Sequence, residues 1–464
     1  MFILMIVIFV LGYLAIALEH PLKVDKAVPA LLIGVLTWTV FVLSGENILE
    51  VFKNFSGTVN VHWSEYLLHH PDGHFVDYVV HNQLLMHLGE ISEILFFLLG
   101  AMTIVEIIDQ HQGFKIITDK IKTTNKVKLL WILSFITFFM SAALDNLTTT
   151  IVMVALLRKL IEDKKDRWFV ASMIILAANA GGAWSPIGDV TTIMLWIKGQ
   201  VTTVPIIVDV FLPSLVTMIV PLTILSFTMK GHDVTRPAIE NEEDGPQISK
   251  RVSTWILIQG VSSLLFVPVF KTVTHLPPYL GMLFGLGLLW LVTEILHKTR
   301  HKETEETKLT VVGILTRVDV PTVLFFLGIL LAVASLQSAG HLTLLAGWLD
   351  DVTHQNIYII DLVIGLLSSI VDNVPLVAGA MGMYDIAPAG SVGTAAMYVQ
   401  DGQFWQFLAY CAGTGGSILI IGSAAGVAAM GMEKIDFIWY MKKISLLALS
   451  GYFAGALVYY LMFS

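Results

Sequence analysis

The chain has 464 residues, of which 56% are hydrophobic and 14% are charged, and its mean hydropathy is +0.77. This composition is typical of a protein that crosses a membrane many times and excludes an ordinary soluble domain. The net charge of −9, with basic residues in short loops, excludes a nucleic-acid-binding protein, and the single cysteine, Cys411, excludes an internal disulfide framework.

Ten stretches are apolar and close to the 20 or so residues that a membrane-spanning helix needs. The first lacks a basic segment ahead of its apolar core, so we expect a first span and not a cleaved signal peptide. The predicted fold is therefore an all-α polytopic membrane protein with about ten full crossings. The predicted spans are 1–18, 27–44, 88–108, 168–197, 204–229, 253–271, 278–297, 319–338, 403–430 and 441–462.

Two further apolar stretches, 129–157 and 357–383, each contain the dipeptide Asp-Asn near the middle. Basic residues lie on both flanks of 129–157, and such flanks prefer the cytoplasmic side. A single crossing cannot place both flanks there, so we predict a re-entrant hairpin with Asp-Asn at its tip.

No Lys or Arg lies between Arg317 and Lys434, so the hairpin 357–383 is predicted to open from the outside. Both termini are then outside, and the loop 45–87 is external. This loop is rich in histidine, but without Cys or a zinc-binding HExxH motif we expect a solvated loop, with pH sensing as the alternative. Its histidines are His62, His69, His70, His74, His81 and His87.

The two halves of the chain resemble each other. Three landmarks recur in one order at a nearly constant offset: 95–98 with 324–327, 145–146 with 372–373, and 180–182 with 414–416. Because the flanking spans 88–108 and 319–338 run in opposite directions, the repeats are predicted to be inverted. Inverted repeats with broken helices and a midplane site are typical of secondary transporters.

This repeat predicts four regions along the chain. The segments 230–252 and 298–317 carry most of the charges between the repeats, and we expect both to be solvated connectors. The predicted regions are 1–87 (N-terminal spans and external loop), 88–229 (first repeat with its hairpin), 230–318 (linker and connecting spans) and 319–464 (second repeat with its hairpin).

The hairpin tips hold the candidate ion-binding residues. A carboxylate at the centre of a membrane helix costs about 2.5–3.5 kcal/mol on insertion scales, so two matched ones indicate a function. Asp145 and Asn146 precede Thr148, and Asp372 and Asn373 form the second tip. We predict that these two pairs bind sodium and protons competitively. The alternative is that each pair only caps a helix.

The predicted span 168–197 is interrupted by glycines and a proline, so we expect it to be unwound at its midpoint. Asp189 would cap its second half, with Thr191 and Thr192 facing the same cavity; a cap without further function is the alternative. In 403–430, Ser423 stands where Asp189 should have a counterpart, which leaves three deep carboxylates. The candidate hinges are Gly181, Gly182, Pro186, Gly415 and Gly416.

Four further acids, which lie near the ends of spans, are predicted to be interfacial. They are Asp209, Glu294, Asp319 and Asp361.

Three segments, 141–150, 181–192 and 370–377, resemble the NhaD-type sodium/proton antiporters of the ion transporter superfamily, which also contains dicarboxylate and arsenite carriers. The resemblance covers most of the chain. It implies exchange of sodium or lithium for protons across a bacterial inner membrane, with no cofactor, by a homodimer that has a scaffold and a mobile part. The functional positions it implies are Asp145, Asn146, Thr148, Asn179, Asp189, Thr191, Thr192, Ser368, Asp372, Asn373, Gly415, Gly416 and Ser417.

Three other functions compete with this prediction. A dicarboxylate or other anion carrier of the same superfamily predicts Lys or Arg near the tips, and neither hairpin core contains one. An intramembrane aspartyl protease also needs two deep acids, but Ile187-Gly188-Asp189 lacks the first glycine of its Gly-x-Gly-Asp motif. An ion channel would not require inverted hairpins.

Overall fold

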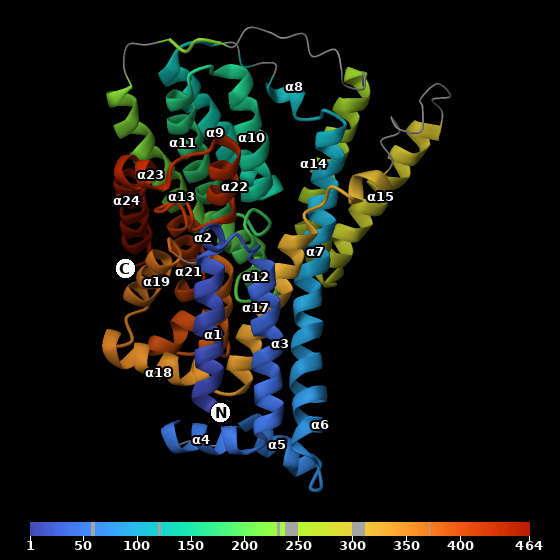
Figure 1. The fold of residues 1–464 in the computed structure, drawn as a ribbon, viewed down its shortest axis with the longest axis vertical. Coiled ribbons are helices and arrows are strands. Elements are labelled where there is room, and N and C mark those ends of the chain that lie inside the picture. Colours follow the sequence, from blue (N-terminus) through green and yellow to red (C-terminus); the bar gives the residue numbers. More distant parts are fainter. Residues whose placement is uncertain are drawn as a thin grey trace. The chain divides into compact units, whose positions relative to one another are not determined.

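The computed structural model describes residues 1–56, 61–118, 121, 123–229, 233–236, 249–298, 311–370 and 372–464. These residues are largely helical and contain no β-strand (Figure 1), which confirms the predicted all-α class. Most of both predicted connectors, at 230–232, 237–248 and 299–310, lies outside the described residues.

Contacts divide the chain into two compact units. Unit 1 consists of Met1–Leu95, Asp319–Ile360 and Val374–Val399, and unit 2 of Phe96–Val318, Asp361–Asn373 and Gln400–Ser464. Each unit takes segments from both predicted repeats. The four regions predicted from the repeat are consecutive segments of the chain, whereas the two units are defined by which residues contact one another. The units therefore do not test the region boundaries, which stay predictions.

Unit 1 is built around α3 (Ala27–Ser44) and α17 (Val320–Ser338), which pack closely against each other. A Cβ on Gly34 would lie 2.7 Å from the carbonyl oxygen of Gly328, so the two backbones approach as only small residues allow. The indole of Trp38 donates to the Leu331 carbonyl at 2.9 Å. The other helices that lie wholly in this unit are α1 (Phe2–Ala17), α2 (Glu19–Leu22), α4 (Asn47–Ser56), α5 (Val61–His69), α6 (Phe75–Asp77), α18 (His341–Thr353), the π-helix η1 (Tyr78–Leu84) and the 3₁₀-helix η3 (Gly393–Tyr398).

Three helices pass from one unit into the other. They are α7 (Leu85–Gln110), α19 (Ile357–Leu367) and α20 (Asn373–Met383).

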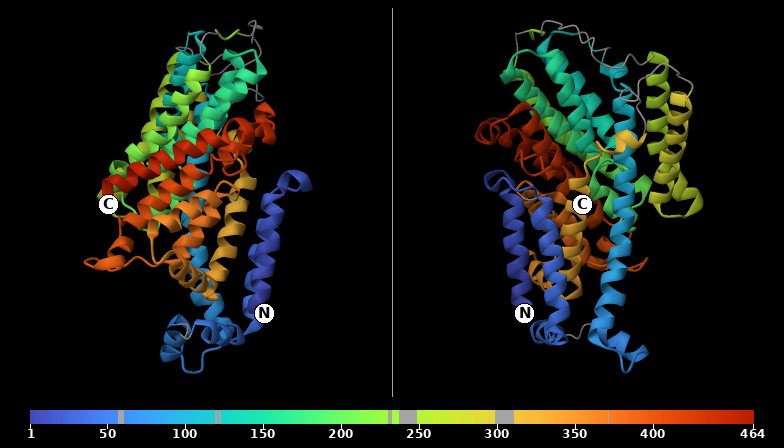
Figure 2. Two further views of the ribbon diagram at one scale, coloured as in Figure 1. Left: turned by 90° about the vertical axis from the view of Figure 1, so that its left-hand side faces the viewer. Right: turned by 45° about the vertical axis from the view of Figure 1, so that its right-hand side comes forward.

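Unit 2 holds the first predicted hairpin and both predicted broken spans. A core cluster of Phe138, Ala177, Ala180 and Met218 joins α9, α11 and α13. The helices α14 and α15 pack against each other (Figure 2). The helices that lie wholly in this unit are α8 (Lys115–Thr118), α9 (Lys126–Leu144), α10 (Asn146–Leu160), α11 (Lys164–Ala183), α12 (Val190–Ile197), α13 (Thr203–Thr228), α14 (Lys250–Thr274), α15 (Pro278–Lys298), α16 (Val311–Leu315), α21 (Gln403–Gly415), α22 (Ala424–Glu433), α23 (Phe437–Lys443) and α24 (Ser445–Phe463).

The helices break where polar and small residues predicted breaks. Asp145 alone separates α9 from α10, and these two helices pack against each other. Helix α11 ends at Ala183 and α12 begins at Val190, while α21 ends at Gly415 and α22 begins at Ala424. Whether the first pair is re-entrant depends on the membrane boundaries and stays a prediction.

The number of long apolar helices differs from the predicted crossings. Eight helices of the described chain are long and apolar enough to cross a membrane, against about ten predicted. Seven coincide with predicted spans. The predicted spans 168–197 and 403–430 are each divided by a break, and 1–18 forms a helix of only 16 residues. Neither divided span therefore forms one continuous spanning helix, although α11 itself has 20 residues, and the 16-residue helix of 1–18 is too short to be counted.

The eighth long helix is α9, the first arm of the hairpin 129–157. It has 19 residues, or roughly 28 Å at 1.5 Å per residue, which approaches the thickness of a bilayer core. The length of α9 alone does not decide between a full crossing and a re-entrant arm, so the hairpin 129–157 stays a prediction. The helix begins earlier than the apolar stretch because the Asn125 side chain caps it, accepting from the Lys128 amide at 2.9 Å.

Candidate cation site

The first tip is held by Asp145, which caps α10. Its two carboxylate oxygens accept from the backbone amide of Thr148 at 2.7 Å and from the Thr148 hydroxyl at 2.8 Å. The backbone of Asp145 has a φ of 110°, which residues other than glycine rarely adopt. Strained backbone of this kind clusters at functional sites, so the tip is a candidate for more than a cap.

Asp189 is the acceptor that joins the two tips. Its side chain is almost fully buried, and Oδ1 caps α12 by accepting from the Thr191 amide at 2.8 Å and hydroxyl at 2.5 Å. Its carboxylate also accepts from Asn146 Nδ2, and from Asn373 Nδ2 at 3.4 and 3.5 Å. One carboxylate thus contacts the asparagine of each Asp-Asn pair while it caps a helix.

Asn179 extends this network into the second broken span. Its amide oxygen accepts from Asn146 Nδ2 at 3.1 Å. Its amide nitrogen donates to the hydroxyls of Ser417 and Ser423, both at 2.9 Å. Ser423 in turn caps α22 by accepting from the Gly426 amide at 3.1 Å. Both broken spans and both tips therefore contribute to one buried polar network.

The acidic groups of this network repel one another. Asp189 interacts electrostatically with Asp145 and with Asp372. Within the described chain, the contacts of Asp145 and Asp189 are with amide and hydroxyl donors and with other aspartates, and none is with Lys or Arg. A buried charge needs a partner. A mobile cation or proton would supply one here.

The candidate hinge glycines serve close packing. Gly181 and Gly182 remain in α11, and Gly415 in α21, while Pro186 lies in the first break. A Cβ on Gly181 would lie 2.1 Å from the Phe138 carbonyl oxygen, and one on Gly415 would lie 2.0 Å from that of Gly365. The two contacted residues precede Asp145 and Asp372 by the same distance along the chain (145 − 138 = 7 and 372 − 365 = 7).

Serine hydrogen bonds repeat in the same way. The Ser141 hydroxyl donates to the Ala178 carbonyl at 2.6 Å, and the Ser368 hydroxyl donates to the Ala412 carbonyl at 2.9 Å. Ser368 was predicted to bind the cation; here its hydroxyl group links the second predicted hairpin to α21. The same local packing therefore surrounds both Asp-Asn pairs.

The structure brings most of the predicted residues together. Asn146, Asn179, Asp189, Asn373 and Ser417 are linked by hydrogen bonds, whereas Thr148 and Thr191 act as capping partners. The Thr192 hydroxyl contacts the Gly182 carbonyl at 3.5 Å. Ser423 was noted in the sequence only as the counterpart of Asp189, and the repeat offset (423 − 189 = 234) was the signal of its role.

Among the described residues, no group of three or more His, Cys, Asp or Glu side chains is arranged to hold a metal ion. Amide and hydroxyl oxygens would therefore have to complete the coordination of an ion bound at the tips.

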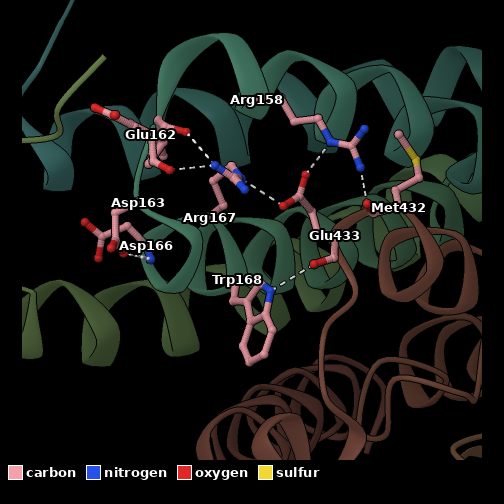
Figure 3. A network of polar contacts seen from close by, with 9 residues as sticks. Arg158, Glu162, Asp163, Asp166, Arg167, Trp168, Met432 and Glu433 are labelled. Carbon is pink, nitrogen blue, oxygen red and sulfur yellow. Dashed lines mark hydrogen bonds and ion pairs between the residues drawn. The ribbon is translucent and has the colours of Figure 1, made fainter. Parts of the chain in front are cut away.

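A different acid in unit 2 has fixed partners. Glu433, at the end of α22, is buried between two arginines (Figure 3). Its carboxylate oxygens lie 2.8 Å from Arg158 Nε and 2.8 Å from Arg167 Nε. Trp168 also donates to the Glu433 carbonyl at 3.1 Å, and Arg158 donates to the Met432 carbonyl. This network joins the end of α10 and the start of α11 to the end of α22.

Comparisons with known proteins identify the family. The citrate transporter (CitMHS) family model matches residues 6–400. Sodium/proton antiporter 2 of Arabidopsis thaliana is 42% identical over 460 residues, which cover 98% of each chain. The Na(+)/H(+) antiporter NhaD of Vibrio cholerae is 31% identical over 487 residues, covering 98% of this chain and 91% of that one. The chain belongs to the NhaD-type sodium/proton antiporter family of the ion transporter superfamily.

Sodium/proton antiporter 1 of Arabidopsis thaliana is another relative, 51% identical over 374 residues. The match covers 80% of this chain but only 62% of that protein's length. Membership of the NhaD-type family makes this protein a multi-pass membrane transporter and excludes the protease alternative.

Proposed function

We propose that this protein exchanges sodium or lithium for protons, and that the two Asp-Asn tips and Asp189 form the exchange site. The observation that carries the proposal is that the Asp189 carboxylate accepts from the amides of both Asn146 and Asn373. This arrangement supports a single site to which both hairpins contribute. The names of the antiporter relatives support the choice of substrate.

The proposed mechanism is competition. With the acids deprotonated, a small cation binds the carboxylate oxygens of Asp145 and Asp372 and the amide oxygens of Asn146 and Asn373, with Asp189 supplying further negative charge. Hard oxygen atoms are the ligands such cations prefer. When the site faces the more acidic side, protons bind the same carboxylates and displace the cation.

The proposal includes a particular architecture. The hairpins 129–157 and 357–383 are re-entrant, and the repeats that contain them are inverted. The matched glycine and serine contacts around Asp145 and Asp372 support this symmetry. A homodimer in a bacterial inner membrane, with both termini outside, completes the proposal. Unit 2, which contains the whole network, is the candidate for the mobile part.

The description of the family model favours one alternative, transport of citrate or a related anion. The carboxylates of the tips would repel such a substrate, and no Lys or Arg of the described residues contacts Asp145 or Asp189 to offset that repulsion. The same vesicles used below decide between these functions if labelled citrate uptake is measured beside cation exchange.

Everted membrane vesicles loaded with a pH-sensitive dye test the proposal. Adding sodium or lithium should dequench the dye in wild-type vesicles, and potassium should have less effect. Asp145→Asn and Asp372→Asn should each abolish dequenching. The matched control is Asp436→Asn, because Asp436 caps α23 through the Trp439 amide and lies outside the network. Sodium-driven proton flux that persists in both tip variants would exclude this site.

A further inference from the structure

Helix α19 carries an acid that the proposed mechanism does not use. Asp361 is completely buried, and neither carboxylate oxygen has a hydrogen-bond partner among the described residues. The sequence predicted an interfacial side chain, and the structure corrects this. Because α19 is apolar on every side, the sequence does not reveal which of its faces is covered.

The surroundings of Asp361 are tightly packed and hold no fixed positive charge. The titratable groups that face it are the Cys411 thiol of α21 and the Tyr452 phenol of α24, both uncharged at neutral pH by their usual pKa values of about 8.5 and 10. No basic group of the described residues interacts with it. A Cβ on Gly365, one turn further on, would lie 2.2 Å from Tyr452 Oη and 2.6 Å from the Cys411 carbonyl oxygen.

These surroundings suit a proton better than a metal cation. A sodium ion needs several oxygen ligands, whereas the side chains that interact with Asp361 supply one thiol, that of Cys411, and one hydroxyl, that of Tyr452. An unpaired carboxylate in such a place is very costly, whereas the neutral carboxylic acid is tolerated. Asp361 should therefore hold a proton in this conformation.

The repeat shows that this position is polar in both halves. The offset between the tips (372 − 145 = 227) maps Asp361 onto Ser134 of α9 (361 − 227 = 134). Ser134 is also buried, and its hydroxyl likewise has no hydrogen-bond partner within the described chain. Asp189 of the first half thus corresponds to Ser423 of the second, and Ser134 of the first half corresponds to Asp361 of the second. Each half holds two deep aspartates, which makes four and not the three expected from the sequence.

We propose that Asp361 is a second proton-binding site, separate from the cation-binding network. The carboxylate takes up one proton from water on one side of the membrane, becomes the neutral acid, and releases that proton on the other side. In the present conformation Asp361 is buried between α19, α21 and α24 and has no contact with water. Exchange of its proton with water therefore requires α19 to move. Asp361 precedes Asp372 by 11 residues (372 − 361 = 11), within the same predicted hairpin 357–383.

The inference rests on the proposed exchange function, and the proton-to-sodium ratio tests it. The ratio is measured from the reversal potential of purified protein in liposomes. Asp361→Asn should lower it by one proton per turnover, with the half-saturating sodium concentration changed less than about twofold. Ser134→Ala, the matched change in the first hairpin, should leave the ratio unchanged. If Asp361→Asn does not fold, Asp361→Ser, which copies the first repeat, takes its place.

Infrared spectroscopy gives a readout that does not depend on transport. In saturating sodium, which keeps the tip carboxylates deprotonated in the proposed mechanism, the wild-type protein should show the carbonyl stretch of a protonated carboxylic acid, and Asp361→Asn should lack it. An unchanged ratio, or an infrared spectrum that the substitution does not alter, overturns the inference. Absence of any exchange by the wild-type protein would instead refute the proposed function, and the infrared result would still decide whether Asp361 holds a proton.

Discussion

Two regions of unit 2 bury an acidic side chain, and they balance its charge in opposite ways. Asp189 and Glu433 are similarly buried, at 1% and 3% exposure. Glu433 lies between the guanidinium groups of Arg158 and Arg167. In the part of the chain that the structure describes, the groups that donate to Asp189 are amides and hydroxyls, and a neighbouring aspartate repels it.

The difference separates a structural acid from a transport acid. A carboxylate with two fixed cations stays ionised and holds helices together, so it has no reason to exchange its counter-ion. A carboxylate without a fixed cation must find its positive charge in a proton or a mobile ion. Exchange requires that second condition, and the network around Asp189 meets it.

The largest expected effect comes from removing the charge at Asp189. Asp189→Asn should reduce sodium-driven dequenching to background, because no carboxylate then joins the two tips. Asn is also a good helix cap, so α12 should still begin at the same place. The control is Asp163→Asn, which changes the cap of α11 outside the network. If the Asp189→Asn variant exchanges sodium for protons as well as the wild type does, the proposed distinction between Asp189 and Glu433 is wrong.

The two tip asparagines should differ in importance. Asn146 contacts both Asp189 and Asn179, whereas Asn373 reaches Asp189 only at 3.4 and 3.5 Å. A hydrogen bond to a charged group contributes about 1.5–3 kcal/mol, or roughly 10- to 150-fold in affinity. Asn146→Ala should therefore raise the half-saturating sodium concentration by about that factor, and Asn373→Ala by less than about tenfold. Titration of dequenching with sodium measures both values, and the reverse order would contradict this geometry.

Much of this arrangement was predictable from local sequence. Asp-Asn, Gly-Gly and Pro mark helix breaks through capping and backbone geometry, which involve only neighbouring residues, and the breaks lie at these motifs. Local sequence offers no means of choosing Asp189 as the shared acceptor, because that choice depends on how α11, α12 and the tips pack. Asp361 was predicted at the membrane interface for the same reason. The start of α9 was missed because its cap, Asn125, lies outside the apolar stretch.

Glu433→Gln should affect stability and not exchange. The substitution leaves Arg158 and Arg167 without their anionic partner and weakens the joint between α22 and the α10–α11 loop. Since Arg158 is half-exposed, we expect a loss of about 1–3 kcal/mol, below the cost of breaking a fully buried pair. Thermal unfolding in detergent measures the loss, with Asp436→Asn as the control on the neighbouring helix. A large rise in the half-saturating sodium concentration, with stability unchanged, would place Glu433 among the transport acids.

The smallest effect is expected at an acid that is neither deeply buried nor deprived of a cation. Asp166 pairs with Lys126, and its side chain is 23% exposed. Pairs of this kind usually contribute less than about 1 kcal/mol, because water competes for both charges. Asp166→Asn should therefore change the unfolding temperature slightly and leave sodium-driven exchange intact. Loss of exchange in this variant would show that transport requires the charge of Asp166 at the start of α11. Burial without a fixed cation would then no longer distinguish transport acids from structural ones.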